Sequence, residues 1–192
     1  NRDRMIMILL YDTAIRIAEL LELKISSLKL TSVPSIHIHG KGDKERSVSL
    51  TDATVSHLKK YLRQFHPEML PDQPLFYTKI KGSIAPMSPG NVSRIINKYA
   101  DAIRSEHPNL PKRLHCHMFR RTRATGLYRN GVELEMISVI LGHSSTETTR
   151  IYATPSIEML GEAMNTANST IPDETPEWEE NEDELARICG LR

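Results

Sequence analysis

The stretch of residues 112–129 holds the side chains best suited to chemistry on an anionic substrate. Its charged residues are all basic, and two histidines accompany them: Lys112, Arg113, His115, His117, Arg120, Arg121, Arg123 and Arg129. On a helix, His117 and Arg120 lie three residues apart and share a face. A guanidinium matches phosphate oxygens and an imidazole can hold or move a proton, so this pair suits a phosphodiester. A basic helix that binds nucleic acid without catalysis has the same composition, and that interpretation stays open.

Further candidate side chains are spread along the chain. Arg16 lies among apolar residues, which indicates partial burial, and Glu19 at the i+3 position could be its partner. Lys41 occupies the polar tip of a predicted hairpin. His143 follows a glycine that ends a predicted helix, and Tyr152 comes nine residues later. Taken singly, each of these is typical of a structural or solvated residue.

The sequence lacks the standard motifs of several other enzyme classes. It has no Gly-rich phosphate loop of the Walker type, no Gly-x-Gly-x-x-Gly, no His-Glu-x-x-His and no Cys-x-x-Cys pair. A metal site built from His115, Cys116, His117 and His143 is an alternative, although that spacing fits no standard zinc pattern. We expect no bound metal ion and no cofactor.

These side chains need a scaffold, and hydrophobic spacing predicts a mainly helical one with a small antiparallel sheet, an α+β fold. Residues 34–39 and 45–50 alternate in polarity around a short polar tip, which predicts a β-hairpin. Helices are expected over residues 3–23, from Thr51 to near Pro67, from Ser88 to about Ser105, and over residues 117–129, 133–141, 157–167 and 183–191. Ser144 and Glu147 have the spacing of a capping box, which predicts one more helix start at Ser144.

The charges are unevenly spread, although the 192-residue chain has 25 Lys and Arg against 24 Asp and Glu. Residues 171–192 contain eight acids and two bases, which leaves a clearly basic body. A basic body favours a polyanionic partner, while an aromatic content of 5% argues against a stacking platform for single strands. We predict a catalytic domain over residues 1–168, followed over residues 169–192 by an acidic linker and a candidate docking helix.

The compartment and the ends of the chain also carry expectations. No apolar run approaches the roughly 18 residues of a transmembrane helix. The two cysteines, Cys116 and Cys189, lie far apart, so we expect a reducing compartment, the cytoplasm. The chain begins with Asn1 rather than Met, from which we expect that an upstream part is missing.

Five short segments combine the candidate residues in a fixed order. They are Thr13 to Leu20 around Arg16, Gly40-Lys41-Gly42-x-Lys44-x-Arg46, His117-x-x-Arg120, Leu141-Gly142-His143, and Tyr152. In this order and spacing, the chain resembles the catalytic domain of tyrosine recombinases, the phage integrase family, over about residues 3–165. It departs from the family pattern at Ala14, where Gly is common, at Cys116, where Pro often precedes the motif His, and at Arg121 and Arg123, where His and an aromatic are frequent.

The resemblance implies a site-specific recombinase that cleaves and rejoins double-stranded DNA through a 3′-phosphotyrosyl intermediate, without ATP or a metal ion. It places catalytic roles on Arg16, Lys41 (the acid), His117 (the base), Arg120 and His143, with Tyr152 as the nucleophile. Glu19 is expected to support Arg16, and DNA contacts are expected from Lys44, Arg46, Arg113, Arg121 and Arg123. It further implies a tetramer assembled on DNA and an origin in a bacterium, a phage or another mobile element.

Two questions stay open after the resemblance. A type IB topoisomerase shares this chemistry, and the small size and compact spacing favour a recombinase over it. The acidic end is either a disordered solubilising tail or a segment whose helix docks on a neighbouring protomer, and its charge could also screen the basic body.

Overall fold

The computed structural model describes residues 1–40, 44–143, 145–168 and 187. The chain divides into two compact units, Asn1–Thr154 and Pro155–Arg192. The elements of the first unit are α1 (Arg2–Asp12), α2 (Ile17–Glu22), η1 (Ile25–Ser27), β1 (Leu28–Lys29), β2 (Ser35–Gly40), β3 (Lys44–Ser49), α3 (Asp52–Phe65), β4 (Tyr77–Ile80), β5 (Ser83–Pro86), α4 (Pro89–Ile103), α5 (Cys116–Arg129), α6 (Leu134–Leu141) and α7 (Glu147–Arg150). In the second unit the structure describes α8 (Ile157–Asn168). The prediction of a mainly helical α+β fold with a small antiparallel sheet is confirmed, and the structure adds a second, two-stranded sheet.

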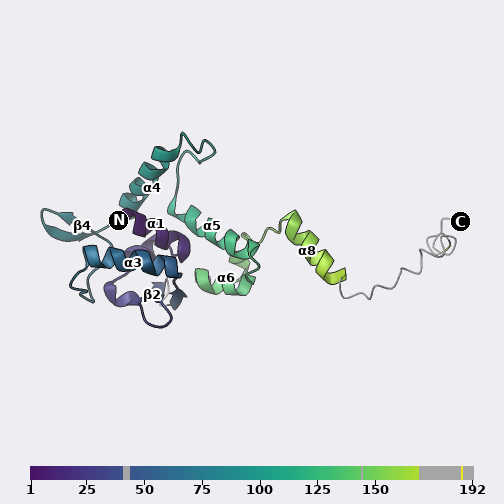
Figure 1. The fold of residues 1–192 in the computed structure, drawn as a ribbon, viewed down its shortest axis with the longest axis horizontal. Helices are drawn as coiled ribbons and strands as arrows, with labels where there is room; N and C mark the ends of the chain where they lie inside the picture. The colour runs from purple at the N-terminus through teal and green to yellow at the C-terminus, as the bar shows by residue number, and fades with distance from the viewer. Residues whose placement is uncertain (41–43, 144, 169–186, 188–192) are drawn as a thin grey trace. The chain divides into compact units, whose positions relative to one another are not determined.

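Helix α1 is the centre of the first unit. Its inward residues Met5, Ile6, Leu9 and Leu10 are fully buried at helical spacing, each contributing about 1.5–3 kcal/mol to stability. The helix contacts α3, α4 and α5. Figure 1 shows α4 and strand β2 on opposite sides of α1. The main hydrophobic core therefore forms around this first helix.

The predicted continuous helix over residues 3–23 is wrong, because the chain breaks between α1 and α2. The Thr13 hydroxyl donates to the carbonyl oxygen of Leu9 at 2.7 Å, which satisfies a carbonyl at the helix end. Ala14 then adopts the left-handed conformation, with φ +51°. The apolar residues keep their helical spacing across this break, so the sequence pattern did not indicate it. The break turns the Ala14 carbonyl and the Arg16 side chain away from the path of α1.

The predicted hairpin is present as β2 and β3, with β1 added at the edge of β2. Ile36 and Ile38 face the core, while His37 and His39 occupy the alternating outward positions. Gly40 pairs with Lys44 at the end of the ladder. Residues 41–43 lie outside the described residues, so the expected position of Lys41 at the tip stays a prediction.

Helix starts are well marked where the sequence offers a capping side chain. The Thr51 hydroxyl accepts from the backbone N–H of Thr54 at the start of α3, and the Ser88 hydroxyl accepts from that of Asn91 at the start of α4. Helix α7 begins at Glu147 instead of Ser144, which itself lies outside the described residues.

Two further features complete the comparison with the expected elements. Strands β4 and β5 form a second hairpin that was not among the expected elements. The expected helix over residues 183–191 lies outside the described residues, apart from Arg187. No helix in the described part of the chain is long and apolar enough to span a membrane.

Candidate active site

The C-terminal end of α6 gathers three arginines from distant parts of the chain. Its last carbonyl oxygens accept from three guanidiniums: Ile140 from Arg46 Nε at 3.3 Å, Leu141 from Arg120 Nη2 at 2.6 Å, and Gly142 from Arg16 Nη2 at 3.4 Å. A helix C-terminus leaves its last carbonyls unpaired and carries partial negative charge, so cations are favoured there. This single helix end therefore builds a concentrated positive site.

Arg120 is the most deeply buried of the three arginines. Its side chain is 2% exposed, and its Nη1 donates to the carbonyl oxygen of Ala14 at 2.7 Å. Burial, together with the charges of Arg16 and Arg46, lowers the pKa of Arg120 to about 10. The guanidinium remains charged at neutral pH. Both of its acceptors are backbone carbonyls, so its position is fixed by the main chain at the α1–α2 break and at the end of α6.

Arg16 is held by a carboxylate instead. Its Nη1 contacts Glu19 Oε1 at 2.8 Å, and its backbone N–H donates to Glu19 Oε2 at 3.0 Å. Glu19 Oε2 also accepts a hydrogen bond from Arg46 Nη2 at 2.8 Å. Burial opposes ionisation of Glu19, but hydrogen bonds from Arg46 and Arg16 outweigh it and lower its pKa to about 2. One buried carboxylate therefore positions two guanidiniums, and Glu19 lies where its predicted supporting role requires.

Gly142 makes room for this arrangement at the end of α6. It adopts φ +64° as the C-cap, which favours glycine. A Cβ at this position would lie 2.8 Å from Arg46 Nη1 and 2.9 Å from its Cδ. The missing side chain lets Arg46 reach both Glu19 and the helix end.

His143 follows directly and is kept neutral. Its Nδ1 shares a 2.8 Å hydrogen bond with the hydroxyl of Thr149, a fully buried residue of α7. Burial, together with the nearby charges of Arg120 and Arg16, lowers the pKa of His143 to about 4. Because Thr149 occupies Nδ1, the other ring nitrogen, Nε2, is left for a ligand.

Tyr152 lies against His143 at the end of this segment. The two rings are stacked, with centroids 6.4 Å apart and an interplanar angle of 20°. Tyr152 is 3% exposed and packs in a small second core cluster with Ala14, Ala124, Ile137 and Leu141. The structure thus brings Arg16, Arg120, His143 and Tyr152 together.

Several other predicted site residues lie outside the group at the end of α6. His117 is exposed in the first turn of α5. Arg113 and Arg121 are exposed, and the backbone of Lys44 pairs with Gly40.

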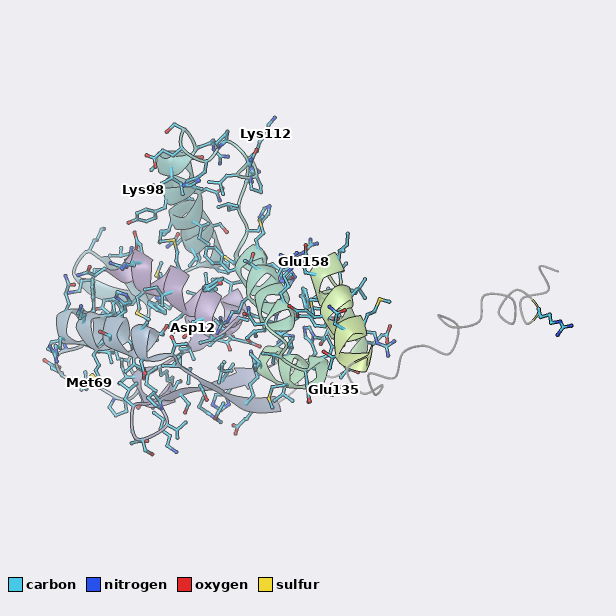
Figure 2. The ribbon with its side chains drawn as sticks, turned by 45° about the vertical axis from the view of Figure 1, so that its right-hand side comes forward. Asp12, Met69, Lys98, Lys112, Glu135 and Glu158 are labelled. Atoms are coloured by element: carbon cyan, nitrogen blue, oxygen red, sulfur yellow. The ribbon has the colours of Figure 1, made fainter. Side chains whose placement is uncertain are left out.

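Arg123 and Arg46 are both engaged with acids. Arg123 Nη2 contacts Asp12 Oδ1 at 3.4 Å; Figure 2 shows Asp12 beside the C-terminal end of α1. The side chain of Arg46 is only 11% exposed. With its Nε, Nη1 and Nη2 all bonded within the protein, Arg46 has a structural position that does not suit its predicted DNA contact.

Two functional neighbours were missed by sequence reasoning. Thr149 has no motif of its own, and for Arg46 the family resemblance implied a DNA contact instead of the contact with Glu19. The signal for Arg46 was its position on the same strand face as the buried Val48, which places it on the core side of the sheet.

The residues near the site do not form the alternative metal centre. Among the described residues, the one group of three or more potential ligands within reach of one another is His37, His39 and Glu45 on the hairpin. Cys116 is half-buried, and burial raises the pKa of its thiol.

Comparisons with known proteins agree with this geometry. A model of the phage integrase family matches residues 1–159. A tyrosine recombinase of Agathobacter rectalis is 40% identical over 152 residues, which cover 79% of this chain and 47% of that protein.

Two solved structures have the same fold. The crystal structure of XerA recombinase superposes with a TM-score of 0.70 at 29% identity, covering 86% of this chain and 56% of the other. The XerH site-specific recombinase, bound to its palindromic difH substrate after cleavage, gives 0.68 at 29% identity, covering 87% and 46%. The chain spans about half the length of the curated relatives it matches.

Proposed function

Because the chain belongs to the phage integrase family, we propose that it is the catalytic domain of a site-specific tyrosine recombinase that cleaves and rejoins double-stranded DNA. The observation that carries this proposal is the convergence of Arg16, Arg120, His143 and Tyr152 at the end of α6. The DNA itself is proposed from the basic surface of α5 and from the XerH relative, which was solved with its DNA substrate.

Arg16 and Arg120 supply the charge that a phosphodiester requires. A phosphodiester is anionic, and its non-bridging oxygens gain further charge in the transition state. Nη1 and Nη2 of Arg120 each donate one hydrogen to a backbone carbonyl among the described residues. Each of these nitrogens carries a second hydrogen, which can bond a phosphate oxygen. Arg16 is partly open to solvent and can offer a second guanidinium to the same phosphate.

Tyr152 is the proposed nucleophile. Its Oη attacks phosphorus, the bond from phosphorus to the 5′ oxygen breaks, and a 3′-phosphotyrosyl bond forms. We assign the Tyr152 proton to His117, and the proton delivered to the departing 5′ oxygen to Lys41, which lies outside the described residues. The neutral His143 directs Nε2 at a non-bridging oxygen. The free 5′ hydroxyl of a partner strand then attacks the phosphotyrosine and restores Tyr152, so the number of ester bonds is unchanged and no ATP is required.

The wider assembly follows from the same proposal. We propose that Lys44, Arg113 and Arg121 contact DNA phosphates, and we leave out Arg46 and Arg123 because acids engage them. Residues 1–168 form the proposed catalytic domain, and residues 169–192 an acidic linker with a docking helix. Four copies would assemble on DNA in the bacterial cytoplasm. Deleting residues 171–192 should impair synapsis while leaving binding of a single site intact.

The test of the catalytic proposal is a nicked suicide substrate built from the DNA that flanks the gene. The unaltered protein should accumulate a covalent protein–DNA adduct, and Tyr152→Phe should form none while still binding DNA. Tyr128→Phe, in the same hydrophobic cluster, is the matched control and should form the adduct. Adducts from Tyr152→Phe would refute the assignment, and DNA binding without adducts from any variant would favour a non-catalytic DNA-binding module. Relaxation of supercoiled DNA without strand exchange would indicate a topoisomerase.

A further inference from the structure

We propose that the outward face of the β2–β3 hairpin binds one divalent transition-metal ion, such as Zn²⁺, through His37, His39 and Glu45. This site belongs to a different face of the sheet from the candidate active site. It does not depend on the recombinase proposal.

The hairpin register places the three side chains on one surface. His37 and His39 are two residues apart on β2, so both point to the same side of the sheet. Glu45 lies directly opposite His39 on the antiparallel partner strand β3. Cross-strand neighbours have Cβ atoms about 4.5–5.5 Å apart, which brings the side-chain ends within reach of a common ion.

The donor atoms already converge on one carboxylate. His37 Nε2 lies 3.2 Å from Glu45 Oε2, and His39 Nδ1 lies 3.0 Å from Glu45 Oε1. All three ligand atoms lie within 4.8 Å of one another. Two ligands of a tetrahedral Zn²⁺ ion are about 3.3 Å apart, because each lies about 2.0–2.1 Å from the metal. Small side-chain rotations are therefore enough to form the site.

The chemistry of the donors favours a transition metal over Mg²⁺ or Ca²⁺. Two imidazoles and one carboxylate form a set that suits Zn²⁺ and its neighbours, whereas the harder cations prefer oxygen ligands throughout. The side chains of His37, His39 and Glu45 are 42%, 65% and 53% exposed, so the fourth position is open to water. Ser47 Oγ lies 3.4 Å from His37 Nδ1 and helps direct Nε2 toward the ion.

The sheet separates this site from the active-site arginines. Arg46 follows Glu45 on β3 and therefore points to the other face, where it contacts Glu19. An ion held here would join β2 to β3 one residue pair before the Gly40–Lys44 pair that flanks residues 41–43. Metal binding would thus hold β2 and β3 together near the end of their described ladder.

The test is a calorimetric titration of the chelator-treated 192-residue chain with Zn²⁺. We expect one saturable equivalent, with excess Mg²⁺ failing to compete. His39→Ala and Glu45→Gln should each weaken binding at least about tenfold, since even losing a residue that only supports a ligand costs about 10–100-fold. His107→Ala, an exposed histidine beyond α4, is the matched control and should leave the isotherm unchanged.

A second measurement keeps the proposal falsifiable if one variant folds poorly. The ring resonances of His37 and His39 should shift on Zn²⁺ addition in the unaltered protein, and thermal melting should show that Glu45→Gln is folded. The proposal is overturned if the unaltered protein takes up no Zn²⁺. It is equally overturned if His39→Ala and Glu45→Gln bind as tightly as the unaltered chain.

Discussion

Arg16 and Arg120 reach the same helix end, but different regions hold them by different means. Arg120 on α5 is 2% exposed and donates to two backbone carbonyls. The side chain of Arg16, at the α1–α2 break, is 41% exposed and depends on the carboxylate of Glu19. Backbone carbonyls do not titrate and barely move, whereas a carboxylate can lose its charge. The charge of Arg120 is therefore held by the backbone of the fold, whereas the charge of Arg16 is held by a side-chain carboxylate.

The largest expected effect comes from Arg120→Ala. DNA cleavage should fall about 100- to 1,000-fold, the usual loss when one preorganised donor is removed. Stability should fall by at least about 2 kcal/mol, because the carbonyls of Ala14 and Leu141 lose a buried donor and a cavity remains. Single-turnover cleavage and urea unfolding measure the two losses. Arg121 is an exposed neighbour, and Arg121→Ala should melt like the unaltered protein. Normal stability of Arg120→Ala would contradict the view that the fold depends on Arg120.

Arg16→Ala should separate catalysis from stability. Cleavage should again fall about 100- to 1,000-fold, while stability changes by less than about 1 kcal/mol, because the side chain is partly solvated and Glu19 keeps Arg46. The same two assays apply, with the exposed Arg63→Ala as a control for removing a surface arginine. A large loss of stability would show that Arg16 is as much part of the fold as Arg120.

Glu19→Gln should leave the charge of Arg16 in place but hold it less firmly. Arg46 and Arg16 lose their ion pairs, so we expect the free energy of unfolding to fall by about 1–3 kcal/mol. The rate of cleavage should fall less than in Arg16→Ala. Glu22→Gln, exposed on the same helix, controls for the loss of one acidic charge. Cleavage below that of Arg16→Ala would contradict the supporting role of Glu19.

The same variant should change how stability depends on pH. The folded pKa of Glu19 is about 2, below its ordinary 4.5, so its contribution is complete above pH 4.5 and is lost as pH falls toward 2. The melting temperature of the unaltered protein should drop across this window, and that of Glu19→Gln should drop less. Parallel pH profiles for the two proteins would rule out this linkage.

Ala14→Gly should give the smallest effect. Relief of the left-handed alanine, worth about 1 kcal/mol, is offset by the flexibility of glycine in the unfolded chain and by the loss of a buried methyl group. The free energy of unfolding should therefore change by less than about 1 kcal/mol. Ala124→Gly removes a methyl from the same cluster inside a helix and should cost about 2 kcal/mol. Equal losses would mean that the Ala14 conformation stores no strain.

Local features were predictable because they depend on neighbours in the chain. The alternation of Ile36 and Ile38 predicted a strand, and the hydroxyl of Thr51 predicted a helix start. The break after Asp12 was not predictable, because Ala14 normally favours a helix and its left-handed conformation is stabilised by contacts elsewhere in the fold. The Ala14 carbonyl, for example, receives Arg120 from 106 residues away.

The sequence alone determined which side chains are present and in what order, and those were enough to indicate the family and the chemistry. The tertiary structure decided how they are held. Arg16 and Gly142 lie 126 residues apart, and no local pattern encodes their contact. The unpaired carbonyls at the end of α6 attract whichever cations the fold brings near, so the roles of Arg46 and Thr149 appear only when the helices are packed. The local Arg16–Glu19 pair, three residues apart, was within reach of the sequence.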